Sequence, residues 1–197
     1  MKSLRAFPLL AALLGSSPQA VQFGGLDVAA RGAAHLDPRT GHTEWPSGGT
    51  ATDTGRGLAL RAQAMQLRPG QSLLARQATL RLAWGGQLSA AQLVYDLGAG
   101  TVTAQGDVTY TDSRLKCLEA QQVVVYTDSG FMLASPDVTS AQPAFSAARF
   151  VFDPSTMQAA LRSAAGQTTL LQFSAQRLSS VRADPSSAEL GRFLPYL

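Results

Sequence analysis

Apolar residues recur along the chain in a repeating pattern. Five short segments share one form, in which a run of small and apolar residues ends in a large apolar residue and a turn follows. The residues that end these runs are Leu36, Leu67, Tyr95, Tyr126 and Phe152, about 26 to 31 residues apart. A period of this length is typical of proteins that stack one supersecondary unit on the next. We therefore expect about five copies of one strand-turn-strand unit.

The residues after each run favour tight reversals of the chain. The segments 37–41, 68–70, 96–100, 127–130 and 153–156 combine Asp, Thr, Pro, Ser and Gly, which supply turn conformations and side-chain acceptors. A second turn pattern recurs in two units, where 104–108 matches 134–138. Two strands and two turns per unit predict an all-β antiparallel protein of about ten or more strands.

The alternation of side chains predicts which face of each strand is buried. In a strand, residues two apart share a face. Counting back by two from each large residue assigns ten apolar positions to one face, which we expect to form a continuous apolar interior. They are Ala34 and Leu36, Met65 and Leu67, Leu93 and Tyr95, Val124 and Tyr126, and Phe150 and Phe152. A sheet that repeats in one direction has no natural end, so its edges need caps or partners.

The two ends of the chain differ from the repeats. Lys2, Arg5 and the apolar run that follows them have the layout of a signal peptide spanning residues 1–20. The alternative is a retained membrane anchor, although a spanning helix needs roughly 20 apolar residues and this run has about half that. We expect an N-terminal strand and a Gly/Thr-rich loop in 21–57, with 41–57 a long turn or loop. The repeats span about 28–175, and 176–197 is a C-terminal tail with a short helix after Asp184.

Charge and composition limit the classes of function. Without Lys2 and Arg5, 14 of the 16 Lys and Arg residues remain against 13 Asp and Glu, so the exported chain carries a net charge of +1. A nearly neutral chain lacks the basic face that nucleic-acid binding needs. Charged residues make up 15% of the chain, against roughly 25% in typical domains. Either lipid or a partner covers part of the surface, or the surface is rich in Ala, Gly, Thr and Gln. The single cysteine, Cys117, is expected to be a small buried residue.

The residues give no support for catalysis. His35, Asp37, His42 and Glu44 have metal-ligand side chains, but their spacing matches no metal motif and Asp37 begins a turn. The chain has no Gly-x-Ser-x-Gly motif and no phosphate-binding glycine loop before a helix. The acidic residues that recur at turns are read as turn caps rather than calcium ligands. We therefore predict a protein that is not an enzyme and has no cofactor and no metal.

One stretch of the repeats resembles a known family. In 88–138, an Ala-x-x-x-Tyr strand, an Asp-x-Gly turn, an apolar strand and a Gly-Asp-Val turn occur in order and then nearly repeat. This pattern resembles the OstA-like family, the periplasmic lipopolysaccharide-transport domains of the LptA and LptC type. The first two units match it poorly, and Pro136 replaces the glycine of the second turn motif. The resemblance implies a β-jellyroll, a folded-over stack of antiparallel strands, with acyl chains of a lipid in its interior. It also implies that such domains join edge to edge between two membranes.

Together these observations predict a non-catalytic periplasmic protein that binds and transports lipid. Its partners would be a lipopolysaccharide-like or other envelope glycolipid and related jellyroll domains, with a homo-oligomer possible and no nucleic acid. The alternative is a self-assembling structural repeat protein of the envelope, with a filled core and no lipid. The expected lipid-binding groove consists of Met65, Leu67, Leu93, Tyr95, Val102, Val124, Tyr126, Phe150 and Phe152.

Overall fold

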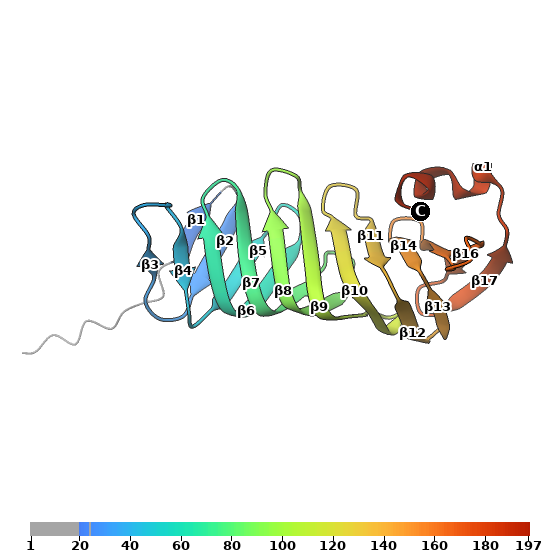
Figure 1. Cartoon of the computed structure of the whole chain (residues 1–197), viewed down its shortest axis with the longest axis horizontal. Helices are drawn as coiled ribbons and strands as arrows, with labels where there is room; N and C mark the ends of the chain where they lie inside the picture. Colours follow the sequence, from blue (N-terminus) through green and yellow to red (C-terminus); the bar gives the residue numbers. More distant parts are fainter. Residues whose placement is uncertain (1–19, 24) are drawn as a thin grey trace, which may run out of the picture.

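The described residues form one antiparallel sheet of 17 strands that is folded over on itself. The computed structural model describes residues 20–23 and 25–197, so residues 1–19 of the expected signal peptide lie outside the described residues. Figure 1 shows the strands following one another along the long axis, from β3 at one end to β17 and α1 at the other. The expectation of an all-β antiparallel jellyroll of about ten or more strands is confirmed.

The strands differ in length between the middle and the ends of the stack. They are β1 (Ala20–Phe23), β2 (Leu26–Ala30), β3 (His35–Leu36), β4 (Thr43–Trp45), β5 (Gly49–Asp53), β6 (Leu58–Arg68), β7 (Ser72–Arg81), β8 (Gln87–Asp96), β9 (Thr101–Thr111), β10 (Lys116–Tyr126), β11 (Met132–Ser135), β12 (Val138–Gln142), β13 (Phe145–Ala147), β14 (Arg149–Asp153), β15 (Gln158–Arg162), β16 (Thr168–Phe173) and β17 (Leu178–Ala183). The five strands β6 to β10 have 10 or 11 residues each.

The five long strands bend and contribute one half to each of two layers. One half of β6 pairs with β5 and the other with β4, and the two halves of β10 pair with β12 and β11 in the same way. We call the layer with β3, β4, β11 and β14–β17 the long layer, and the layer with β1, β2, β5, β12 and β13 the short layer. The apolar residues between the layers form one continuous core.

The crease between the layers explains the second turn pattern. The 104–108 segment was expected to be a turn, but it lies inside β9, which stays paired with β8 and β10 on both sides. Gly106 and Asp107 have φ of 72° and 49° and add one residue to β9, so the strand bends without ending. At the same crease the Gln121 side chain donates to Asp137 Oδ2 at 2.7 Å. The expectation of a turn there was wrong, because a bulge uses the same residue types.

The 41–57 segment is not the loop that its glycines suggested, because it contains β4 and β5. Gly48 explains the composition: its φ is 67°, and a Cβ there would lie 2.1 Å from the Ala62 carbonyl oxygen. Only glycine allows the chain to pass this close to β6. The glycine content therefore reflects a close approach of backbones within the sheet.

The C-terminal segment covers the outside of the long layer. It consists of the short helix α1 (Ser187–Leu190), which begins with a capping box between Ser186 and Glu189, and the 3₁₀ helix η1 (Gly191–Tyr196). Phe193 is buried with Val151 and Ala160 on the outer face of β14 and β15. Over the described part of the chain, residues 20–23 and 25–197, no helix is long and apolar enough to cross a membrane.

Candidate functional site

An uninterrupted row of paired side chains runs along the inside of the long layer. We call it the inner row; in order of pairing it is Leu36, Thr43, Leu67, Leu73, Tyr95, Val102, Val125, Met132, Phe152, Ala159, Leu171 and Val181. Neighbouring strands lie about 4.8 Å apart, so twelve residues make a row about 50 Å long. The nine members from Leu67 to Leu171 are buried.

The two ends of the inner row are exposed. Leu36 in β3 is 65% exposed and Val181 in β17 is 59% exposed, although both continue the buried face. Within the described chain, β3 pairs only with β4, and β17 only with β16. Leu36 was expected to be buried, but no further strand stacks on it. The interior therefore presents an apolar side chain and a free strand edge at each end.

Seven of the nine predicted groove residues face the interior. Tyr95, Val102, Phe152 and Leu67 lie in the inner row, and Met65, Leu93 and Phe150 lie in the adjacent row on the same face; all seven are buried. Phe150 and Phe152 stack with ring centroids 6.3 Å apart. The period-two alternation placed these residues correctly because their neighbours on the opposite face include polar side chains.

The other two predicted residues, Val124 and Tyr126, lie on the outer face of β10. Val125 pairs with Val102 in the inner row, and Tyr126 pairs with Thr101. Tyr126 packs against Tyr196 of the C-terminal segment, with ring centroids 5.0 Å apart. The assignment of these two residues to the interior was therefore wrong. In β10 the inward-facing residue, Val125, is followed by one more strand residue, Tyr126, before the turn begins. Because residues 123–125 are all valine, no polar side chain marks which of them face outward.

The interior between the layers is filled by side chains. One enclosed cavity of about 10 Å³ lies between Leu58, Leu60 and Leu80 of the short layer and Leu73, Tyr95 and Val102 of the long layer. A cavity of this size holds about one water molecule. Acyl chains can occupy this space only if the two layers move apart.

The layers meet at the edge opposite the crease, which we call the mouth. There Asp53 and the turn that follows it, in the short layer, contact the end of β8 and the turn 127–130 of the long layer. The Tyr95 hydroxyl donates to Asp53 Oδ2 at 2.6 Å, and Arg56 Nε donates to Asp128 Oδ1 at 3.0 Å. Arg56 also donates to Asp53, from its backbone N–H to Oδ1 at 3.0 Å and from Nη1 to Oδ2 at 3.3 Å. We call these four residues the mouth latch.

The mouth latch shifts the pKa of its own members. Burial acts to raise the pKa of Asp53, but the hydrogen bonds from Tyr95 and Arg56 outweigh it, and the pKa lies below its usual 3.8. Burial, together with the hydrogen bond to Asp53, raises the pKa of Tyr95 to about 12. At neutral pH the carboxylate of Asp53 is therefore ionised and the Tyr95 hydroxyl keeps its proton, the states that this hydrogen bond requires.

Farther along the mouth, a buried ion pair within the turn after β9 contacts the long layer. Asp112 accepts from Arg114 Nε at 2.8 Å, and both side chains are almost fully buried. The Arg114 guanidinium lies 4.9 Å from the centre of the Phe152 ring and donates to Met157 Sδ at 2.7 Å, both in the long layer. Tyr110 donates to Asp112 at 2.9 Å. Burial raises the pKa of Tyr110 well above its usual value.

Sequence reasoning did not identify Asp53, Arg56, Asp112 or Arg114. The one available signal was the turn chemistry of 53–57, which resembles the other turns that begin with Asp but lies in a segment read as a loop. The expectation for Cys117 was also wrong: this residue is exposed, at a strained φ of 51°.

The predicted turn caps and the metal-ligand cluster have ordinary partners. Asp37 Oδ1 accepts from the Arg39 N–H at 2.9 Å, and Asp96 Oδ1 accepts from the Ala99 N–H at 2.8 Å. Asp153 caps the turn of Ser155 and Thr156, and also binds Arg192 of the C-terminal segment. Glu44 accepts from the Gln66 side chain at 2.8 Å.

Comparisons with known proteins find little at the level of sequence. No protein-family model and no curated protein matches the chain. Among solved structures, the chain is similar to LptH from Pseudomonas aeruginosa, described as the LptA homologous periplasmic component of the lipopolysaccharide transport device. The two are 14% identical, the match covers 56% of this chain and 81% of LptH, and the TM-score is 0.49.

Proposed function

We propose that the protein is a non-catalytic lipid-binding and transport component of the periplasm, which holds acyl chains between its two layers. The inner row supports this proposal most directly, because it is apolar along almost its whole length and has an exposed apolar residue at each end. A core that served only stability would have no need to continue to Leu36 and Val181, where water contacts both. The resemblance of 88–138 to OstA-like domains suggests a lipopolysaccharide-like glycolipid as the cargo.

The free strand edges support assembly with related domains. β3 and β17 offer backbone groups to a further strand, and Leu36 and Val181 would be buried by it. Strand addition of this kind joins the backbones by hydrogen bonds and continues the apolar row. We propose that edge-to-edge assembly, with further copies or with other jellyroll domains, extends the path for lipid beyond one molecule.

The energetics suit a carrier that releases its cargo. Burial of one methylene contributes about 0.8 kcal/mol, so a few methylenes hold a lipid and still permit transfer. The seven interior residues of the predicted groove, with Val125 in place of Val124 and Tyr126, are the proposed contacts.

A direct test places a photoreactive aliphatic diazirine amino acid at Leu93, on the inner face, or at its neighbour Val94, on the outer face. The full chain is expressed with its leader, irradiated in an envelope fraction and analysed by mass spectrometry. We expect lipid adducts at position 93 and none at position 94. Equal labelling at both positions, or no adduct at position 93, would contradict lipid binding in the interior.

One observation favours a second function, a structural envelope protein that assembles through the same edges without lipid. The interior has an enclosed cavity of only about 10 Å³. Native mass spectrometry of the gently purified protein separates the two. Lipid at defined stoichiometry supports the carrier and identifies its cargo, whereas a ladder of lipid-free oligomers supports the structural protein.

A further inference from the structure

The enclosed cavity lies directly beneath the mouth latch. Asp53 and Tyr95, which form the shortest hydrogen bond of the latch, are also part of the cavity wall. Leu58 and Leu80 approach it from the short layer, and Val102 from the long layer. This cavity is therefore separated from solvent by a few polar contacts.

The two parts of the mouth are closed in different ways. In the mouth latch, the side chain of Arg56 is 33% exposed and that of Asp128 is 73% exposed, so water can replace their interaction at low cost. In the second part, the side chains of Arg114 and Asp112 are 4% and 1% exposed, and Arg114 reaches the long layer through its contacts with Phe152 and Met157. A cation–ring contact that is shielded from water is stronger than an exposed one. The first contact is readily reversible and the second is not.

From this difference we propose that the mouth latch is the gate through which acyl chains pass into and out of the interior, while the contacts of Arg114 with the long layer act as a fixed hinge. Opening breaks the Tyr95–Asp53 hydrogen bond and the Arg56–Asp128 ion pair, and separates the turn at 54–57 from the end of β8 and from the turn at 127–130. The Asp53 carboxylate and the Arg56 guanidinium then meet solvent, so neither charge of the latch is left buried without a partner. This gate rests on the proposed function, because it regulates access to the same interior.

The gate has a kinetic signature. The Tyr95 hydroxyl donates to a charged acceptor, and such a bond stabilises the closed state more than a neutral one does. Removing it in Tyr95→Phe should speed lipid uptake by about tenfold, because the bond must break before the lipid enters. Arg56→Ala should speed uptake by about threefold, because an exposed ion pair contributes less. Tyr95→Phe keeps the aromatic ring in the apolar wall, so the substitution removes the hydroxyl alone.

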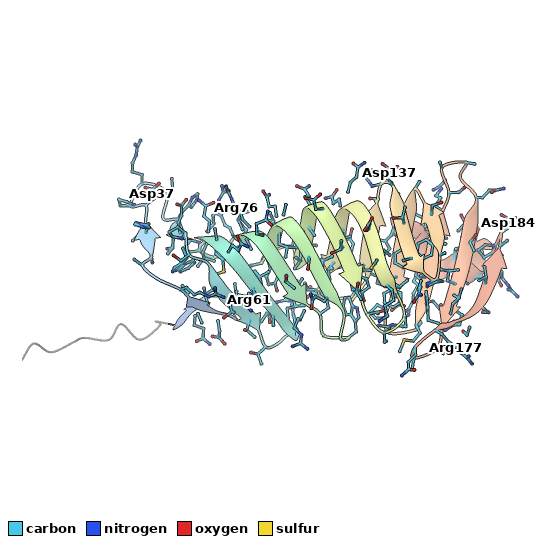
Figure 2. The ribbon with its side chains drawn as sticks, turned by 90° about the horizontal axis from the view of Figure 1, so that it is seen from below. Asp37, Arg61, Arg76, Asp137, Arg177 and Asp184 are labelled. Carbon is cyan, nitrogen blue, oxygen red and sulfur yellow. The ribbon has the colours of Figure 1, made fainter. Side chains whose placement is uncertain are left out.

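The test is stopped-flow uptake of a dansyl-labelled fatty acid by the purified full chain. Arg61→Ala is the matched control, because Arg61 lies in β6, the strand that follows the latch turn, and its side chain is exposed (Figure 2). We expect faster uptake in Tyr95→Phe and Arg56→Ala and the wild-type rate in Arg61→Ala. Uptake at the wild-type rate in both latch variants would overturn the gate while leaving lipid binding intact.

Hydrogen exchange without lipid tests the gate independently. We expect faster exchange in segments 54–57 and 127–130 of Tyr95→Phe and unchanged exchange around Arg114. Wild-type exchange in these two segments would overturn the gate whether or not lipid binds. Faster exchange together with no fatty-acid uptake in wild type or any variant would instead overturn the proposed function, and with it the passage of lipid through the mouth.

Discussion

Placing a carboxylate on either face of β10 tests the assignment of the interior. Val123 is fully buried and pairs with Ala104 and Ala134, both of which are also fully buried. Val123→Asp loses about 1.5 to 3 kcal/mol of apolar burial, and placing the new polar group there without a partner costs about 2 kcal/mol or more. The total, about 3.5 to 5 kcal/mol, approaches the whole stability of a typical domain.

The matched substitution one residue along should behave differently. Val124 lies on the outer face, is only half-buried and pairs with Thr103 and Leu133, so a carboxylate there reaches water. Val124→Asp should cost about 1 kcal/mol, within the usual range for partly exposed sites.

Urea unfolding followed by tryptophan fluorescence measures both substitutions. With a slope of about 2 kcal/mol per molar urea, Val123→Asp should lower the midpoint by about 2 M, or leave the protein unfolded without urea. Val124→Asp should shift the midpoint by about 0.5 M on the same slope. A larger loss for Val124→Asp than for Val123→Asp would refute the assignment of faces in β10, and with it the course of the inner row.

Three further predictions concern single residues. Gly48→Ala should destabilise the protein by about 2 kcal/mol or more, because the new Cβ would meet a backbone oxygen at positive φ. Gly70→Ala is the control, because nothing lies within 4 Å of its Cβ, and thermal denaturation should show a distinctly smaller loss of stability for it. Ser140 has a buried hydroxyl without a hydrogen-bond partner, so Ser140→Ala should be neutral or raise stability by about 1 kcal/mol. A marked loss of stability in urea unfolding would contradict the absence of a hydrogen bond to this hydroxyl. Because the folded-state pKa of Asp53 is lowered, its contribution to stability is full above the unfolded value of 3.8 and is lost as the pH falls below it. Denaturation at a series of pH values should therefore show a steeper loss below about pH 4 in wild type than in Asp53→Asn, and parallel curves would contradict this.

Local patterns predicted the architecture but not every register. Alternation placed Leu93 and Tyr95 on the inner face because a polar residue, Gln92, marks the opposite face of that strand. Where the pattern carried no contrast, as in the valines of β10, the phase was wrong by one residue. The same limit applies to 104–108, where glycine and aspartate at positive φ suit both a turn and a bulge, and only the pairing of β9 with both neighbours distinguishes them.

The mouth was beyond the reach of local patterns. Asp53 and Tyr95 are 42 residues apart, and Arg56 and Asp128 are 72 apart, so no period or turn rule connects them. The outer apolar face of β14 and β15 likewise had no explanation until the C-terminal segment was seen to cover it.

The sequence by itself determined the strand-and-turn repeat, the antiparallel jellyroll and the apolar character of the interior, because these follow from side-chain alternation and turn chemistry over a few residues. The tertiary structure alone decided whether that interior is open or filled, and which residues hold its mouth closed. Those features depend on how the two layers meet, which is set by contacts between segments distant in the chain.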